Sequence, residues 1–462
     1  MKQFGTKSLE ELENLSKEEL VKYSDELTKL YEEIIKRKPE KNSNNSSISP
    51  STNKDKTKPK KNQSLRSKSG RSSGGQKGRE GKTLKQTDDP DKTTILGADV
   101  DVCKKCGADL STTVAKLLEK RQKLDIDIGK ARAEYEEFQR FGKVCPICGE
   151  MNSEEFREDV KPNISYGSNI KSIVLYLSVA QFISYKRVTE VMRDCFGVNL
   201  SEGSVGNILK ESYEKSKPVI ETFKDEIYKS SMVGIDETGT YVGGKRLWSW
   251  VFHNSEYVVI VVDNSRGSKV IKENFPDGFV NATICHDNYS AYNSLVCKDE
   301  QICIAHKLRD LNYAIDCDGN EVIEEIKDLL LEALEYDKSA LPHQRETLKH
   351  NFEVSIDSLL QKEVDESEKE TLKQIKSLKK LEDKLFTFMI YEDVPADNNE
   401  SERIIRNIKV KQKVSGFFKT DDGGQAYANL RSILETANRK NVNKLQALLY
   451  LLEEKKLFIN SG

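Results

Sequence analysis

Three short stretches of the chain carry carboxylates where phosphoryl-transfer chemistry is possible. Residues 232–238 form an apolar run that ends on Asp236, and residues 283–289 contain a second apolar run that ends on Asp287. The third stretch is polar, contains Glu402 and begins a basic segment that we expect to be helical. The residue types and their positions predict that Asp236, Asp287 and Glu402 form one divalent-metal site.

The chemistry follows from the ligand type, because hard cations such as Mg²⁺ or Mn²⁺ prefer oxygen ligands. Two such ions held about 3.5–4 Å apart can stabilise both the attacking and the leaving oxygen of a phosphoryl transfer. In this interpretation Asp236 bridges the two ions, Asp287 binds one and Glu402 binds the other. Each acid could instead be a surface or capping carboxylate, and a helix could present Asp397 or Glu400 in place of Glu402.

A second metal site is expected between residues 95 and 152. Two Cys-x-x-Cys pairs occur there, each followed by glycine, and they consist of Cys103, Cys106, Cys145 and Cys148. Four thiolates form a closed, structural Zn²⁺ site, with glycines where the backbone must turn tightly around the metal. The 38 residues between the pairs exceed those of a compact ribbon and are expected to include a helix over 111–138. The alternatives are a redox pair or four unrelated thiols.

Length and composition set the class of protein. A chain of 462 residues is too long for one core, so two to four domains are expected. Charged residues make up 32% of the chain, and no run of about 18 apolar residues suggests a membrane span. The polar N-terminus lacks the apolar segment of a secretion signal. We therefore expect a cytoplasmic protein, in which nine cysteines would be unusual as disulfides.

The N-terminal part, residues 1–38, is predicted to be a coiled-coil helix. Ser16 and Glu19 have the spacing of a capping box at the start of a helix over 9–37. Apolar residues then repeat every seven positions as in a coiled coil. The seam consists of Leu20, Leu27 and Ile34, with Tyr23 and Leu30 between them. The helix could dimerise or dock on its own chain, and we favour a dimer because a charged linker follows.

That linker, residues 39–94, carries a strong local charge. The whole chain has a net charge of −2, yet residues 54–85 contain twelve Lys or Arg and two acids. The segment is rich in Ser, Asn, Lys, Gly and Pro and has too little apolar surface to fold alone. It could be a solvated tether, a basic arm that neutralises DNA phosphates, or both.

Residues 160–225 are predicted to be a helix-turn-helix-like domain. The apolar periodicity over 166–217 indicates three helices. Gly197 breaks the chain after the second helix, and Leu200-Ser201 opens the third. A helix, a turn containing Gly and a Ser-capped helix are the parts of a DNA-reading helix-turn-helix. Plain helix packing is the alternative.

The catalytic core is predicted to begin at residue 228, its first part extending to residue 318. The expected order is strands 231–235, 247–252 and 257–262, a helix at 268–274, strand 282–286, a short helix at 290–295 and strand 301–305. Three antiparallel strands followed by alternating helix and strand is the order of a ribonuclease H-like fold. Asp236 would then lie on the central first strand and Asp287 just past the fourth.

The remainder divides into a helical insertion, 319–390, and the last part of the core, 391–462. The insertion is highly charged, and its leucines suggest packed antiparallel helices. The last part contains Glu402, a break at Gly423-Gly424 and final helices over 425–438 and 443–457. The fold class is therefore multidomain α+β. Basic residues that could face DNA phosphates, or merely form a solvated face, follow the glutamate: Arg403, Arg406, Lys409 and Lys413.

Taken together, these motifs resemble the insertion-sequence 66 family of transposases, whose members carry a DDE catalytic triad. The resemblance runs nearly end to end. Its motifs are Ser73-Gly74-Gly75-Gln76-Lys77-Gly78 with Gly81-Lys82-Thr83-Leu84, the two Cys-x-x-Cys-Gly pairs, Tyr166-Gly167 with Leu200-Ser201, Asp236-Glu237-Thr238 with Leu247-Trp248, Asp287-Asn288-Tyr289 with Tyr292, Cys303-Ile304-Ala305-His306, and Asp397-Asn398-Asn399 with Glu402-Arg403 and Arg406. The last motif implies that Glu402, not Glu400, completes the triad.

Two positions depart from the family pattern. Asn288 stands where Gly usually follows the second aspartate, and Ser401 stands where a small apolar residue is usual. Neither departure removes a ligand. His306 could orient phosphate or lie in the core, and His286 is expected to be structural. Trp248 and Trp250 alternate along a strand, so we expect both on one side, in the core rather than as platforms for bases.

The resemblance implies a DNA transposase. Such an enzyme would cleave DNA at the inverted repeats of an insertion sequence and join the freed 3′-hydroxyl to target DNA, using Mg²⁺ or Mn²⁺ at the acids and structural Zn²⁺ at the cysteines. A homodimer or higher oligomer would hold two ends, and accessory proteins encoded by the element could take part. When bound to DNA, the protein would be associated with the nucleoid. The alternatives are a non-catalytic DNA-binding regulator and a ribonuclease H-like nuclease.

Overall fold

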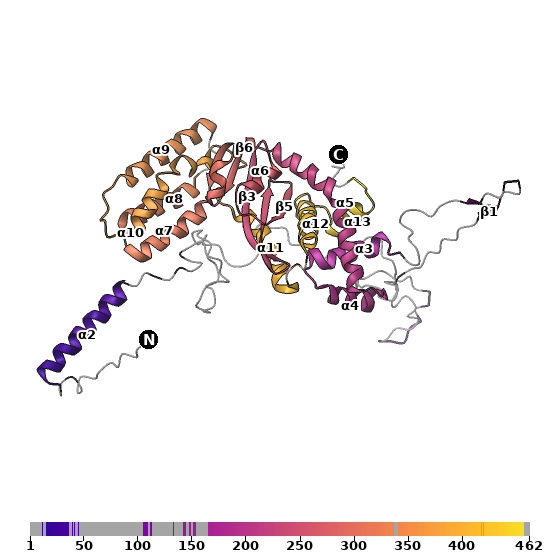
Figure 1. Ribbon diagram of the computed structural model, residues 1–462, viewed down its shortest axis with the longest axis horizontal. Helices are drawn as coiled ribbons and strands as arrows, with labels where there is room; N and C mark the ends of the chain where they lie inside the picture. Colours follow the sequence, from indigo (N-terminus) through magenta and orange to yellow (C-terminus); the bar gives the residue numbers. More distant parts are fainter. Residues whose placement is uncertain are drawn as a thin grey trace. The chain divides into compact units, whose positions relative to one another are not determined.

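The computed structural model of the chain describes residues 165–456, except 337–340, 417 and 419, together with parts of the preceding segment (Figure 1). Before residue 165 it describes residues 12, 15–36, 39, 41, 45, 105–109, 111–112, 133, 142–144, 147–148 and 151–153. Two compact units are present, residues 64–135 with 194–198 and the remainder, and most elements below belong to the larger unit. None of the helices in these described parts has the length and apolarity needed to cross a membrane.

Near the N-terminus, helix α2 spans Lys17–Lys36 and confirms a helix in this segment. Its cap is the predicted one, since the Ser16 N–H donates to Glu19 Oε2 at 2.9 Å and the Glu19 N–H donates to Ser16 Oγ at 3.4 Å. Leu20 and Leu27 are 40% and 42% exposed, as the seam of a coiled coil would be in a single chain. Dimerisation through this helix stays a prediction.

A two-stranded antiparallel pairing lies near the second Cys-x-x-Cys motif. Strands β1 (Gly142–Val144) and β2 (Met151–Ser153) pair antiparallel, so Cys148 lies in the loop between them. At the first pair, Gly107 has a φ of +74°, which fits the tight turn expected there. Cys103, Cys145, most of the segments 39–94 and 95–152 and the helix expected over 111–138 lie outside the described residues, so the zinc site stays a prediction.

The central element of the larger unit is a five-stranded mixed sheet. Its strands are β3 (Met232–Val242), β4 (Lys245–His253), β5 (Val258–Asp263), β6 (Phe279–His286) and β7 (Cys297–Ile302). The order is β5-β4-β3-β6-β7, with β3, β4 and β5 antiparallel and β6 and β7 parallel to β3. This arrangement puts β3 at the centre, as the sequence predicted.

Several strand boundaries differ from the predicted ones, since β6 and β7 begin earlier, at Phe279 and Cys297, and β3 and β7 also end elsewhere. Strand β3 does not end at Asp236 but continues to Val242 in register with β4. The two-residue turn at Gly243-Gly244 has φ values of +56° and +78°, a geometry that matches the twist of a hairpin and lets both strands extend. Strand β7 ends at Ile302 because the chain turns into helix α7 (Ile304–Asp318), so residues 303–305 are not a strand.

Helices cover the sheet on the side of β5. The predicted helical triplet is present as α3 (Ser168–Leu175) with a π-helical turn at Tyr176–Ala180, α4 (Tyr185–Phe196) and α5 (Glu202–Tyr228). Ser201 caps α5 by accepting the Ser204 N–H at 3.0 Å. Helix α5 packs against α12 (Asp421–Arg439), which also packs on β5, and α13 (Lys444–Leu452) packs on α3.

The break predicted at Gly423-Gly424 is wrong, because both glycines lie inside α12. The helix begins earlier, where Thr420 Oγ1 accepts the Gly423 N–H at 3.1 Å. A Cβ at Gly424 would come within 3.2 Å of Val242 Cγ2 on β3. The glycine therefore serves close packing of a helix on a strand, not a chain break.

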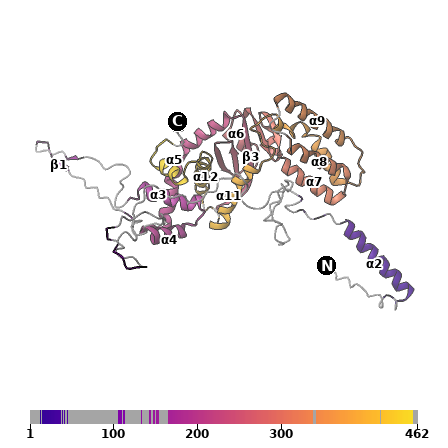
Figure 2. The same ribbon diagram turned by 180° about the vertical axis from the view of Figure 1, so that it is seen from behind.

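The opposite end of the sheet carries a helical lobe made of α7, α8 (Glu321–Leu334), α9 (Pro342–Leu360) and α10 (Lys369–Leu378) (Figures 1 and 2). As predicted for the insertion, Leu330, Ile356 and Leu360 are buried in its core, which extends to Ile302 of the sheet. The lobe leaves and rejoins the sheet at one place, since the Ile304 N–H donates to the Ala396 carbonyl at 2.9 Å.

After the lobe, helix α11 (Asn399–Ser415) packs against β3 and β4. Figure 1 shows it beside the sheet, close to β3. The remaining described elements are short: α6 (Lys269–Asn274) and 3₁₀ turns at Ser290–Ser294, Glu382–Lys384 and Thr387–Met389.

Candidate active site

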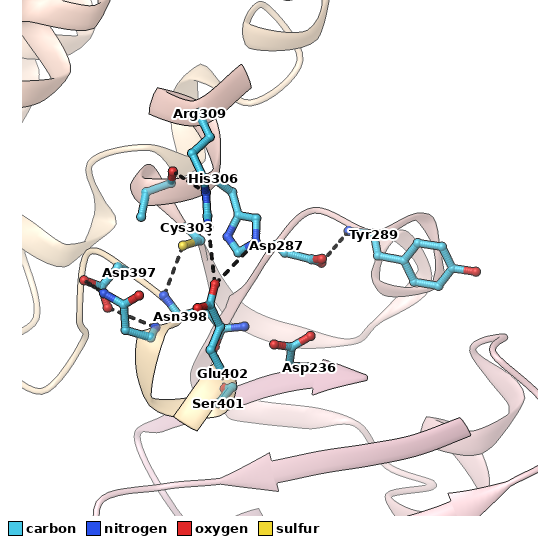
Figure 3. Close-up of polar contacts among 12 residues, drawn as sticks. Asp236, Asp287, Tyr289, Cys303, His306, Arg309, Asp397, Asn398, Ser401 and Glu402 are labelled. Atoms are coloured by element: carbon cyan, nitrogen blue, oxygen red, sulfur yellow. Dashed lines mark hydrogen bonds and ion pairs between the residues drawn. The ribbon is translucent and has the colours of Figure 1, made fainter. Parts of the chain in front are cut away.

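The three predicted acids come from three different elements and surround one space (Figure 3). Asp236 lies in the middle of β3, Asp287 directly follows β6, and Glu402 lies in the first turn of α11. Parallel pairing of β3 with β6 brings the two aspartates to the same region of the sheet. The packing of α11 on β3 brings the glutamate there from the side.

The acids of the site repel one another, and this repulsion changes the pKa of Asp236. Burial raises the pKa of Asp236 well above its usual value, and the negative charges of Asp287, Glu237 and Glu402 raise it further. This coupling places the three acids within electrostatic reach of one another. Among the described residues, however, no three His, Cys, Asp or Glu side chains are grouped closely enough to hold a metal ion as they stand.

Glu402 is held by two side chains of α7. Its Oε1 lies 3.2 Å from Arg309 Nη2 and 3.7 Å from His306 Nε2 (Figure 3). Burial and the neighbouring Arg309 lower the pKa of His306 and favour its neutral form. The other ring nitrogen of His306, Nδ1, is buried and has no hydrogen-bond partner in the described part of the chain. His306 thus belongs to the site, although its role there is open.

The two acidic neighbours of Glu402 have partners of their own. Glu400 Oε1 lies 2.9 Å from Arg439 Nη2 on α12. The carboxylate of Asp397 accepts the Asn399 N–H at 3.1 Å and so caps the start of α11. Both alternatives to Glu402 therefore have other partners.

Asn398 fixes the start of α11 against the sheet. Its side-chain amide donates to the Ile235 carbonyl at 3.1 Å, next to Asp236, and its backbone N–H donates to Cys303 Sγ at 3.1 Å. These two bonds join the helix to β3 and to the start of α7. The Asp-Asn-Asn and Cys-x-Ala-His motifs thus meet in space, and they position the carboxylate of Glu402.

The unusual Ser401 has a specific partner. It is fully buried, its hydroxyl bonds to Asn398 Oδ1, and it lies 2.8 Å from His253 Nε2 on β4. Burial lowers the pKa of His253 to about 3, so this histidine is neutral. Beneath the ring, a Cβ at Gly234 would come within 2.3 Å of His253 Nε2. The polar residue at 401 is therefore accommodated by a histidine that itself requires glycine at 234.

Asn288 departs from the family pattern without changing the turn. Its φ is +69°, a left-handed conformation that glycine adopts freely and asparagine adopts more readily than most other residues. The Asn288 N–H donates to His286 Nδ1 at 3.1 Å, and His286 Nε2 lies 3.1 Å from Glu300 Oε2. His286 is therefore structural, as predicted: it holds the turn that presents Asp287.

The predicted DNA-contacting residues of α11 divide into two groups. Arg403, Arg406 and Lys413 are exposed. Lys409 is partly buried, and its ammonium group donates to the Gly239 carbonyl of β3. Burial and nearby Arg246 lower the pKa of Lys409, so its environment differs from that of the exposed residues.

The sequence analysis did not single out two arginines that contact glutamates of the site. Arg309 stands three residues after His306 on a helix, and that spacing could have placed both on one face. Arg266 follows β5 without any motif, and it bonds Glu237, the neighbour of Asp236. Trp250 is fully buried, as predicted, but Trp248 is only partly buried and has arginines against its ring.

The chain also matches a protein-family model. The model described as "Transposase IS66 family" matches residues 163–426, more than half of the chain. The chain belongs to the transposase IS66 family. No curated protein matches the chain. The matched segment of this IS66-family transposase contains all three acids, and membership supports a role in transposition, and hence in binding and processing DNA.

Proposed function

We propose that this IS66-family transposase cleaves DNA at the ends of an insertion sequence and joins the freed 3′-hydroxyl to target DNA by metal-dependent phosphoryl transfer. The observation that carries the proposal is the convergence of Asp236, Asp287 and Glu402 from β3, β6 and α11. The order and directions of the five strands are those of a ribonuclease H-like core.

The residues present fit the divalent cations that a DDE transposase implies. The donors are carboxylate oxygens, which suit Mg²⁺ or Mn²⁺. Asp236 is buried among negative charges that a cation would offset. Asp236, Asp287 and Glu402 would hold the ions, which when bound supply charge stabilisation for the attacking and leaving oxygens.

The chain's own residues would contribute position and charge. Asp236 is fixed on the central strand, and Asn398 ties the start of α11 to it. In the structure Glu402 faces Arg309 instead, so its carboxylate must exchange that partner when the site is loaded. The exposed Arg403 and Arg406 lie one and four residues after Glu402 on α11, where they can contact DNA phosphates.

The proposed reaction has two phosphoryl transfers. Water attacks the phosphodiester at the element's end, the bond to the 3′ oxygen breaks, and that oxygen leaves as a hydroxyl. The 3′-hydroxyl then attacks a target phosphodiester, forming one P–O bond as another breaks. No covalent link between protein and DNA is needed.

A cleavage assay on end-bearing DNA with Mg²⁺ tests the proposal. Asp236→Asn, Asp287→Asn and Glu402→Gln should each abolish nicking and joining while DNA binding persists. Glu400→Gln is the matched control. Glu400 lies on the same helix turn as Glu402 but pairs with Arg439 of α12, so the change should be tolerated. Nicking by Asp236→Asn at the wild-type rate would overturn the site. Binding without nicking by the unmodified protein would favour a regulator, and cutting without joining a nuclease.

The N-terminal parts are proposed to hold DNA. Cys103, Cys106, Cys145 and Cys148 would bind structural Zn²⁺, and the helices α4 and α5 with the basic linker would contact DNA. Cys145→Ser should then release zinc and weaken recognition of the element's end. Zinc content by atomic absorption decides this, because an unchanged content contradicts four thiolate ligands.

A further inference from the structure

We propose that Arg266 and Arg246 form a second phosphate-binding site, which holds the backbone of the DNA strand beside the candidate catalytic aspartates. The inference rests on the proposed function only in placing the bound phosphate next to the cleaved bond. That the two arginines bind phosphate is argued from their own contacts. It starts from a buried carboxylate that the phosphoryl transfer does not use, that of Glu237.

Glu237 anchors the first arginine. Its side chain is 1% exposed, and its Oε1 accepts hydrogen bonds from Arg266 Nε at 2.9 Å and Nη2 at 2.7 Å. The Tyr292 hydroxyl donates to the other carboxylate oxygen of Glu237. A two-point bond to a buried acid fixes the plane of the guanidinium group, which a surface arginine would not have.

Two aromatic rings fix the same guanidinium group. Its central carbon lies 3.9 Å from the ring centroid of Tyr289 and 4.6 Å from that of Trp248. The guanidinium group of Arg246 lies 4.8 Å from the Trp248 ring. Arginines and rings thus alternate along a row from the exposed β3–β4 hairpin to the turn after Asp287.

The row ends at the candidate active site. The Tyr289 N–H donates to Asp287 Oδ1 at 3.0 Å (Figure 3), and Glu237 directly follows Asp236 on β3. Each aspartate is therefore one residue or one hydrogen bond away from a group that positions Arg266. A phosphate bound by Arg266 would belong to a nucleotide near the cleaved bond.

The chemistry favours an anion as the ligand. The bonds to Glu237 use Nε and Nη2 of Arg266 and leave Nη1 for an outside acceptor. The Arg266 side chain is 40% exposed although it is held at three points. An arginine that is pre-oriented and still accessible suits a phosphate oxygen, and the second arginine extends the positive surface along a strand.

The test measures binding of a fluorescently labelled DNA duplex with an unpaired 3′ strand, without added Mg²⁺ or Mn²⁺, over a range of salt concentrations. Because the proposed cleavage needs one of these ions, the result does not depend on the proposed catalysis. Arg266→Gln and Arg246→Gln should each lower the slope of log affinity against log salt by about 0.7–0.9, the value for one lost phosphate contact. Lys298→Gln is the matched control, because Lys298 lies over a ring, that of Tyr391, at the β7 edge.

Folding must be separated from binding, since Arg266→Gln leaves Glu237 with one partner fewer. Arg246 has no bond to Glu237, so Arg246→Gln tests the same surface without that cost. Unchanged salt slopes in both variants, with thermal unfolding like that of the unmodified protein, would overturn the proposal.

A scan with single methylphosphonates, which remove the charge of one phosphate, locates the contact. One position next to the cleaved bond should weaken binding to the unmodified protein and have no effect on Arg266→Gln. If every position weakens both proteins equally, Arg266 contacts no phosphate. Loss of cleavage in Asp236→Asn with an unchanged scan would leave both proposals standing, whereas cleavage by that variant would overturn only the catalytic one.

Discussion

Asp236 is buried and has three negatively charged neighbours. This arrangement lowers the stability of the folded protein, as is common where residues serve a functional site. Because its folded-state pKa lies above the unfolded value, the free energy of unfolding falls as the pH rises between the two values. Above its folded-state pKa the protein carries the full cost of ionising this group.

Asp236→Asn should raise the free energy of unfolding at neutral pH by roughly 0.5–2 kcal/mol, the range for changes that relieve a strained functional site. Denaturant unfolding in EDTA measures the change, which should vanish in acid, where Asp236 is protonated in both states. The control is Asp328→Asn on the exposed face of α8, expected to be near neutral. A less stable Asp236→Asn at neutral pH would contradict the electrostatic argument.

A pair of glycines on β3 tests the packing beneath α11. Gly234→Ala should destabilise the fold by about 1–3 kcal/mol, because its Cβ would overlap His253, which is confined between β4 and Ser401. Gly239→Ala is the control, since its Cβ meets only the exposed end of the Arg246 side chain, 3.3 Å away. Equal melting temperatures for the two variants would show that His253 can move.

At the scale of elements, the sequence predicted the strands and most helices but not where β3 ends. Residues 237–240 are polar or Gly and suggested an exit from the sheet. They stay in the strand because Glu237 forms an ion pair with Arg266 and accepts a hydrogen bond from Tyr292, which are 29 and 55 positions away. Contacts between residues so far apart in the sequence cannot be predicted from local hydrophobic periodicity.

The acids illustrate the same limit. Two aspartates after apolar runs are visible in the sequence, because strand order places them side by side. The choice of Glu402 over Glu400 needed the family resemblance, since helical periodicity alone allows several acids. In the structure Glu400 pairs with Arg439 of α12, whereas Glu402 pairs with Arg309 of α7.

Helix α11 is also tied to the helical triplet, by a lysine. Lys411 is buried, its ammonium group donates to the Ser178 carbonyl at 3.1 Å, and burial lowers its pKa to about 8. The unfolded chain binds the proton more tightly, so the free energy of unfolding should rise as the pH increases from about 8 toward 10.5.

Lys411→Met should therefore be more stable than the unmodified protein at pH 7, by on the order of 1–3 kcal/mol given 1.36 kcal/mol per pKa unit. The difference should shrink as the pH is raised through that window. Urea unfolding at several pH values measures it, with the exposed Lys413→Met as control. If the difference in the free energy of unfolding does not vary with pH, ionised Lys411 does not destabilise the folded protein.

At the scale of the whole molecule, the exposed seam of α2 predicts self-association. If the unmodified protein sediments as a dimer or larger species, Leu27→Glu should reduce its mass, because a charge in a coiled-coil seam cannot be buried without a partner. Val21→Glu is the control, since Val21 is 61% exposed and lies off the seam. Sedimentation of both variants decides, and an unchanged mass for Leu27→Glu would assign the assembly to another surface.

The hydrogen bond from Ile304 to Ala396 closes the helical lobe at its base, so the chain leaves the sheet and returns at neighbouring points. Glu402 is then anchored from the sheet through Asn398, independently of how long the excursion is. A change in the length of the lobe should therefore leave the carboxylate in place. The same independence makes the exposed connection between α9 and α10 a natural attachment point for a fluorescent reporter that follows the protein on DNA.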